Sequence, residues 1–434
     1  MLAAVGLAYA GIVYFFKDRV EDVLNRALDK ISSLDKKTMV LIIVVLMIVL
    51  RIFYSLFFGF DASSDGDISI YYSIADSLAN GVKPDGTISH LYGMAVHIAL
   101  FKFLHIEPTI GLFIAICLTV IINLFTFSDL IGKEKAFFVA LIYVLMPSTS
   151  LFTLCPTHEV FVFLYISLFI FGFNHLLKNG NLYWNILYSL ICICSVILCT
   201  FVNPAGYILY VILGLALILA NTDKIKKIFI VFIMVLSLIG SNVISGESSE
   251  MDKYRTTINT YYILIHGANP ESLGEQIDSY PEILIDTYRN THNLELSYEN
   301  TLYSAGQVLK EHYLYLLKNP VTLLKIIVHK FYILYSGVHY PINMANAYGS
   351  VNGFMYYLML AVNTLIYLFM LTVGLVYFKK KDDDIRVNNI RLVLLGNICV
   401  TMLCVVLNKY SIYVTLFIFF IAMYRTGLKE SINE

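Results

Sequence analysis

The chain has 434 residues, of which 58% are hydrophobic and 14% are charged, and its mean hydropathy is +0.73. Soluble domains are about half apolar and about a quarter charged, so this composition excludes an ordinary soluble protein. The formal net charge of −1 gives no reason to expect a nucleic acid as a partner. Apolar stretches of roughly 15 to 25 residues recur along the chain, and a spanning helix needs about 20. We therefore predict an all-α polytopic membrane protein.

The N-terminal unit is predicted to comprise residues 1–37. Its apolar start, "MLAAVGLAYAGIVYFF", has no basic stretch before it, which favours a retained membrane or interfacial helix over a signal peptide. Residues 17–37 carry six Lys or Arg residues and have the pattern of an amphipathic helix. Because Lys and Arg concentrate in cytoplasmic loops, we place this helix at the inner surface. The span 38–60 then runs from inside to outside.

The first external loop is predicted at residues 61–108 and is acidic. Residues 61–89 contain five Asp and one Lys. The following segment, 90–106, is short and is interrupted by His and Lys. If it lies along the outer surface, the basic "GKEK" at 132–135 falls inside, as the charge rule requires. We therefore predict a juxtamembrane helix there.

The remaining spans alternate so that every short basic loop lies inside. Residues 38–245 form the predicted transmembrane catalytic module, residues 246–352 an external polar loop with a second juxtamembrane helix at 319–337, and residues 353–434 the C-terminal transmembrane helices. The total is about 10–11 transmembrane helices, each near the length that a bilayer requires. After 38–60, the predicted spans are 109–131, 136–152, 160–177, 183–202, 205–221, 228–245, 353–378, 388–408 and 411–424.

The seven cysteines lie in or beside apolar segments, and the long polar loop contains none. Their spacing matches neither a disulfide framework nor a zinc site. We interpret them as packing residues.

This topology brings polar residues from distant parts of the sequence to the outer face. Most have a plain structural alternative: acids favour helix N-termini, His158 and Glu159 can cap the span that follows them, and Lys residues extend from apolar surfaces to water. Together, however, two acids, a third acid and a lysine can supply a base and a phosphate clamp. The residues are Asp65, Asp67, His158, Glu159, Asn203 and Lys409.

Four motifs occur in a characteristic order. "SDGDISIYYSIADSLANG" resembles a D-x-x-x-Y-x-x-x-A-x-x-L-x-x-G pattern that begins at Asp67, with Asp65 completing a D-x-D. "LMPSTSLFTLCPTHEVFVFLY" resembles a stretch with two prolines and a closing acid. "CTFVNPAGYILYVIL" contains Asn203-Pro204, and "LNKYSIYVTLFIFFIAMY" contains Lys409-Tyr410.

From about residue 40 to residue 425, the chain resembles GT-C-type integral membrane glycosyltransferases. That family usually has Arg-Pro at the position of Asn203-Pro204 and Arg-Tyr at the position of Lys409-Tyr410. The most similar group is the bacterial polyprenyl-phosphate-sugar-dependent type, related to protein O-mannosyltransferases and aminoarabinose transferases.

The resemblance implies a GT-C-like fold and an inverting transfer of a sugar from a polyprenyl-phosphate donor. The acceptor is a protein, a glycan or a lipid, and the reaction takes place at the extracytoplasmic face of the cell membrane, among membrane lipids. Asp65 or Asp67 would be the catalytic base. No cofactor is implied, although these two acids have the oxygen ligands that a divalent cation prefers. The residues implied to bind substrate are His158, Glu159, Asn203, Lys330, Lys409 and Tyr410.

Three other functions stay open. A polysaccharide polymerase or ligase would use a lipid-diphosphate oligosaccharide and would depend on arginines in its large loops, whereas residues 246–320 contain two. A transporter or lipid flippase would place ionisable groups at mid-membrane, whereas the acids here lie at the ends of spans. The last alternative is a membrane scaffold without chemistry.

Overall fold

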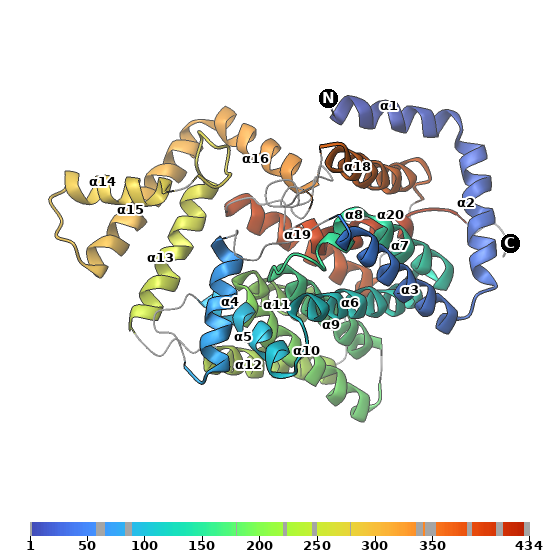
Figure 1. The fold of residues 1–434 in the computed structure, drawn as a ribbon, viewed down its shortest axis with the longest axis horizontal. Helices are drawn as coiled ribbons and strands as arrows, with labels where there is room; N and C mark the ends of the chain where they lie inside the picture. Colours follow the sequence, from blue (N-terminus) through green and yellow to red (C-terminus); the bar gives the residue numbers. More distant parts are fainter. Residues whose placement is uncertain are drawn as a thin grey trace.

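The computed structural model describes residues 2–57, 66–82, 89–178, 180–219, 224–244, 250–277, 279–335, 342, 353–379, 384–404 and 411–428. Within these ranges all regular secondary structure is helical, apart from one isolated bridge between Phe378 and Thr426 (Figure 1). The predicted all-α fold is confirmed.

Six helices of the described ranges are long and apolar enough to cross a membrane, so the chain is a multi-pass membrane protein. Several of them leave large apolar side chains exposed along one side, as Val235, Ile239 and Val243 do on α12. Such a surface is suited to lipid rather than to water. The six helices are α3 (Lys36–Ser55), α6 (Pro108–Ile131), α9 (Glu159–Lys178), α10 (Leu182–Val202), α12 (Lys224–Ile244) and α18 (Gly353–Val376).

Four predicted spans appear as shorter or interrupted helices. The predicted span 136–152 is broken at Met146, which is extended (φ −68°, ψ 127°) because it precedes Pro147. The break separates α7 (Lys133–Leu145) from α8 (Pro147–Leu151). The others are α11 (Ile208–Leu219), α19 (Ile385–Leu403) and α20 (Ser411–Tyr424).

Helix α9 lies at the centre of the bundle and packs against α6, α10, α19 and α20. It is apolar on nearly all sides, which is the pattern of a helix surrounded by other helices. Aromatic side chains fill the adjoining core. Phe127 of α6 stacks on Phe420 of α20 with ring centroids 4.3 Å apart, and Phe163 of α9 meets Phe417 edge to face at 5.9 Å.

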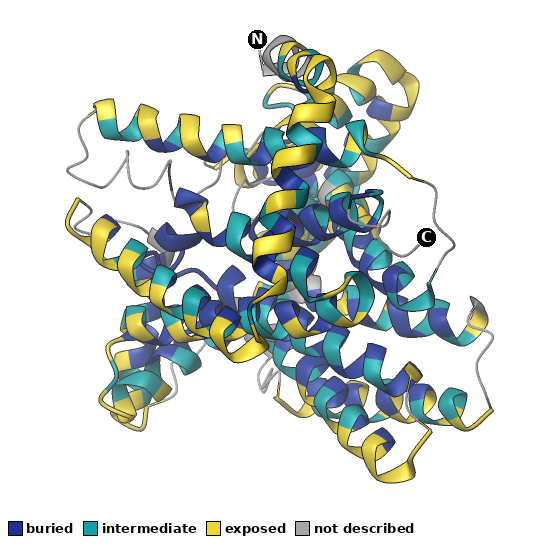
Figure 2. Cartoon of the chain, turned by 90° about the vertical axis from the view of Figure 1, so that its right-hand side faces the viewer, coloured by how far each residue is buried: buried dark blue, intermediate teal, exposed yellow. Residues whose placement is uncertain are grey.

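The segment predicted as an amphipathic helix is α2 (Lys17–Ser32), which follows α1 (Leu2–Phe15). Leu24, Leu28 and Ile31 are buried, at the spacing of one helical face, and α2 packs against α7. Figure 2 looks onto α2 and shows exposed and buried residues alternating along it. The Lys133 ammonium, at the start of α7, donates to the Ser32 carbonyl at 3.0 Å.

Residues 246–320, which the sequence predicted only as a polar loop, are largely helical. Apolar residues recur there every three to four positions, and Ile258, Ile265, Ile285, Ala305 and Val308 form a separate small core. The predicted juxtamembrane helix at 319–337 is α16. The helical unit comprises α13 (Glu250–Gly267), α14 (Tyr280–Thr291), α15 (Tyr298–Lys318) and α16 (Pro320–Tyr335).

Two helices lie within the predicted external loop 61–108, α4 (Gly66–Ala79) and α5 (Ser89–Phe103), and they pack against each other. Helix α5 also packs on α10 through Gly93. A Cβ atom at Gly93 would lie 2.3 Å from the Phe201 carbonyl oxygen and 2.8 Å from the Val202 Cα. Because these are main-chain atoms, only a glycine fits at this contact.

We therefore expect Gly93→Ala to lower the free energy of unfolding by about 2 kcal/mol, as overpacking of a close contact does. Thermal unfolding of the detergent-solubilised protein measures the change. Gly214→Ala in α11 is the matched control, because nothing lies within 4 Å of the added methyl group. Equal midpoints for the two variants would contradict the close contact.

Candidate functional site

The structure describes the side chains of four of the eight predicted site residues. Asp67 belongs to the first turn of α4, but its side chain is not among those described. Asp65, Lys409 and Tyr410 lie outside the described residues. The four that can be placed are His158, Glu159, Asn203 and Lys330.

His158 and Glu159 are buried together at the N-terminus of α9, with side-chain exposures of 5% and 0%. His158 Nε2 lies 3.1 Å from Glu159 Oε1. On the other side of the imidazole, Nδ1 lies 3.0 Å from the hydroxyl of Tyr71. If the Tyr71 hydroxyl donates to Nδ1, a neutral imidazole carries its proton on Nε2, the nitrogen nearer the carboxylate.

Tyr71 connects this buried pair to the acidic segment. It lies on α4 four residues after Asp67, so the two positions share one face of that helix. Tyr71 itself is only 2% exposed. The phenol of α4 and the imidazole–carboxylate pair of α9 thus form a continuous polar chain across two helices that are 87 residues apart.

The third acid of the segment, Asp76, has a separate partner. Its Oδ1 lies 2.5 Å from the ammonium of Lys102 on α5, and its side chain is 63% exposed. This agrees with a structural role on α4, and Asp76 is not part of the buried chain.

The turn that leads into α9 is held by a residue that the sequence analysis did not single out. Arg51 on α3 donates through Nη1 to the Thr153 carbonyl at 2.6 Å and through Nη2 to Thr109 Oγ1 at 2.8 Å. Its guanidinium also lies over the ring of Phe113, 5.4 Å from the centroid. The sequence could have indicated Arg51, because it is a single arginine near the end of an apolar span, and a charge in that position needs partners.

We expect Arg51→Lys to lower the midpoint of thermal unfolding and to raise the KM of any reaction at this site. The lysine ammonium is a single compact donor and does not reproduce the planar guanidinium, whose two nitrogens donate to Thr153 and Thr109. One of these two hydrogen bonds is therefore lost, at a cost of about 1–2 kcal/mol. The control is Lys37→Arg near the start of the same helix, where the side chain is exposed. An unfolding midpoint unchanged by Arg51→Lys would show that the two guanidinium hydrogen bonds do not stabilise the turn before α9.

Asn203 ends α10 as its C-cap, with an extended backbone (φ −154°, ψ 132°) and its N–H donating to the Cys199 carbonyl at 2.9 Å. The Pro that follows it stops the helix. Helix α10 packs on both α5 and α9, so Asn203 belongs to a helix that contacts the elements around the buried chain.

Lys330 on α16 is fully buried, and its ammonium contacts the end of α19. It donates to the Met402 carbonyl at 2.8 Å and to the Cys404 carbonyl at 2.7 Å. Burial lowers the pKa of Lys330 to about 8. Two of its donors are therefore engaged by main chain immediately before the segment 405–410, which contains Lys409 and Tyr410.

The described residues contain no group of three or more His, Cys, Asp or Glu arranged to hold a metal ion. All seven cysteines are described, and each is a free thiol. The described part of this site offers groups for proton transfer and hydrogen bonding. The contributing groups are a carboxylate, an imidazole and a phenol.

No protein-family model and no curated protein matches the chain. Among solved structures, it is similar to an archaeal oligosaccharyltransferase from Archaeoglobus fulgidus in complex with an inhibitory peptide and a dolichol-phosphate. The sequence identity is 11% and the TM-score is 0.41, and the match covers 90% of this chain and 50% of the other. This chain thus spans about half the length of that enzyme.

Proposed function

We propose that the chain is a GT-C-type membrane glycosyltransferase that moves a sugar from a polyprenyl-phosphate donor to an acceptor hydroxyl at the extracytoplasmic face. The observation that carries the proposal is the contact between Tyr71 and His158. The acidic motif and the closing acid of the second motif are joined there in one buried chain. These two motifs are among those on which the family resemblance rests.

The proposed reaction is a single displacement. The acceptor oxygen attacks the anomeric carbon, the bond from that carbon to the phosphate oxygen breaks, and polyprenyl phosphate leaves with the bonding electron pair. The acceptor proton passes to the carboxylate of Asp65 or Asp67. Because attack and departure take place on opposite faces of the sugar, the anomeric configuration is inverted. A positioned base typically contributes about 100- to 10,000-fold to such a step.

The buried chain is proposed to position the donor rather than to act as the base. Glu159 and His158 would accept and donate hydrogen bonds with sugar hydroxyls, and Tyr71 would hold the first turns of α4 against α9. Lys409, with Asn203 and Tyr410, would contact the departing phosphate. A lysine offers a single positive charge there where an arginine would offer a bidentate fork.

A photoreactive donor tests the location of this site. The probe is a polyprenyl-phosphate sugar with a diazirine on the sugar, added to the detergent-solubilised protein and mapped by peptide mass spectrometry. We expect labels in the peptides that cover α4 and the start of α9, suppressed by an excess of unlabelled donor. Labels that an excess of donor does not suppress, or labels confined to other helices, would contradict the proposed site.

A pair of matched variants tests the role of the carboxylate. Glu159→Gln is expected to reduce this labelling about tenfold, because the amide no longer carries the charge that orients His158. Glu295→Gln changes the same functional group on an exposed residue of the segment between α14 and α15 and is expected to have no effect. Equal labelling of the two variants would remove Glu159 from the site.

A further inference from the structure

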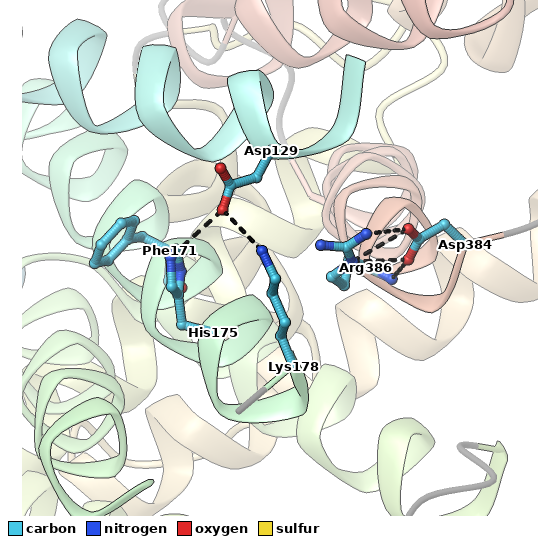
Figure 3. Close-up of polar contacts among 6 residues, drawn as sticks. All are labelled: Asp129, Phe171, His175, Lys178, Asp384 and Arg386. Carbon is cyan, nitrogen blue, oxygen red and sulfur yellow. Dashed lines mark hydrogen bonds and ion pairs between the residues drawn. The ribbon is translucent and has the colours of Figure 1, made fainter. Parts of the chain in front are cut away.

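A second polar cluster lies at the other end of α6 and α9, away from the site proposed above. Asp129 near the end of α6, with His175 and Lys178 in the last turn of α9, surrounds a small hollow to which Arg386 of α19 contributes. Asp129 Oδ2 lies 3.7 Å from His175 Nε2 and 3.6 Å from Lys178 Nζ (Figure 3). The structure thus gathers residues from three helices that are distant in sequence.

The hollow is lined by donors that lack acceptors. Asn174 also lines it and is 4% exposed. Its Oδ1 accepts from Asn389 at 2.9 Å, whereas its Nδ2 has no hydrogen-bond partner in the part of the chain that the structure describes. Arg386 uses Nε and Nη2 on Asp384, which leaves Nη1 without a hydrogen bond to the described residues. Among the described residues, the Lys178 ammonium has a 3.6 Å contact with Asp129 alone, which is longer than a hydrogen bond.

A buried donor without an acceptor is costly, so the Asn174 amide, with the partly exposed Lys178 and Arg386 cations beside it, indicates a missing acceptor at the edge of the hollow. The hollow has a volume of about 10 Å³, which holds no more than a water molecule, so the anion that meets these donors would lie at its open side with its oxygen atoms toward them. Two carboxylates, Asp129 and Asp384, already balance the charges of Lys178 and Arg386. These four charged side chains together carry no net charge. The cluster therefore favours an anion with a single negative charge over one with two.

We propose that this hollow, the inner hollow, binds the phosphodiester of a membrane phospholipid. A phosphodiester carries one negative charge and has two unesterified oxygens, which suit the Asn174 amide and the Lys178 and Arg386 cations. Arginine and lysine are the side chains that phosphate groups prefer.

The position of the inner hollow supports a lipid as the source of the phosphate. It lies where α6 and α9 end and α19 begins, which is the cytoplasmic end in the predicted topology. Helix α7 starts two residues after α6 ends, and its first residue, Lys133, donates to the end of α2. The ends of apolar spans and an amphipathic helix thus meet at one level, which is where lipid headgroups lie.

The test is a binding titration with delipidated protein in neutral maltoside micelles. Dioctanoyl phosphatidylglycerol supplies the phosphodiester, dioctanoylglycerol the same tails without phosphate, and inorganic phosphate the free anion. Calorimetry is expected to show saturable binding of the phosphodiester lipid and no binding of dioctanoylglycerol. Binding of inorganic phosphate as tight as that of the lipid would overturn the lipid source and assign the site to a soluble anion.

Variants locate the binding. Lys178→Gln and Asn174→Leu are each expected to weaken lipid binding about tenfold, as the loss of one hydrogen bond to a charged group does. Lys178 is 56% exposed, so its substitution preserves the fold even if Asn174→Leu does not. The control is Lys224→Gln, an exposed lysine at the start of α12. Equal affinities of Lys178→Gln and Lys224→Gln would overturn the proposal, because they would indicate general attraction to a basic surface.

Discussion

Asp65→Asn or Asp67→Asn is expected to lower the turnover number of sugar transfer by about 100- to 10,000-fold, which is the range for loss of a general base. Asparagine keeps the size of the side chain but cannot take up the proton of the attacking hydroxyl group. The variant that removes the base should show a low kcat with a nearly unchanged KM, because donor contacts are kept. The other variant should retain more activity and thereby identify the base.

The matched control for this pair is Asp76→Asn on the same helix. Asp76 is exposed and paired with Lys102, so its substitution should leave transfer within about threefold of the wild type, as surface changes usually do. Thermal unfolding of all three variants tests whether the fold is kept. If both Asp65→Asn and Asp67→Asn transferred sugar at the wild-type rate, the proposed base would be wrong.

Lys330→Met is expected to loosen the contact between the helical unit α13–α16 and the end of α19. The substitution keeps an unbranched side chain but leaves the Met402 and Cys404 carbonyls without their donor, at a cost of about 2 kcal/mol. Hydrogen exchange of the amides in α16 and in the last turn of α19 should become faster. Lys325→Met on the same helix changes an exposed lysine and should leave exchange as it is.

The same contact predicts a pH dependence. The pKa of Lys330 is about 8 in the folded protein and 10.5 without burial, so between these values the unfolded chain binds more protons at this position. Stability should therefore rise with pH through this window, by about 2 kcal/mol at pH 9.5, and stay flat below pH 8. A neutral amine still donates to both carbonyls. Lys330→Met should lack this rise, and an equal rise in the variant would assign it to other groups.

Patterns within one segment predicted much of the fold. The charge and spacing of residues 17–37 predicted the amphipathic helix α2, and long apolar runs predicted helices such as α6 and α9. The break at Met146 was missed, although Pro147 marked it, because the apolar run continues through both residues. The helices of the 246–320 segment were missed because their small core of Ile, Val and Ala is surrounded largely by tyrosines and by polar residues, which make the segment polar on average.

Contacts between distant segments were less predictable. The distribution of basic residues among the loops predicted that the first acidic segment and the His158–Glu159 pair lie on the same, outer face. It did not predict that Tyr71 contacts His158. It also gave no sign that Lys330 contacts the end of α19. The inner hollow depends on Asp129, Lys178 and Arg386, which are far apart in sequence, and each taken alone is an ordinary charge at a helix end.

The most direct measurement is release of free polyprenyl phosphate by the purified wild-type protein. A panel of radiolabelled polyprenyl-phosphate sugars would be supplied with a membrane extract as acceptor, beside Asp65→Asn and Asp67→Asn. We predict turnover with one donor, an inverted anomeric linkage in the product, and loss of turnover in one variant that remains folded. Absence of turnover with every monophosphate donor, together with turnover of a lipid-diphosphate oligosaccharide, would contradict the proposed reaction and favour a polysaccharide polymerase or ligase.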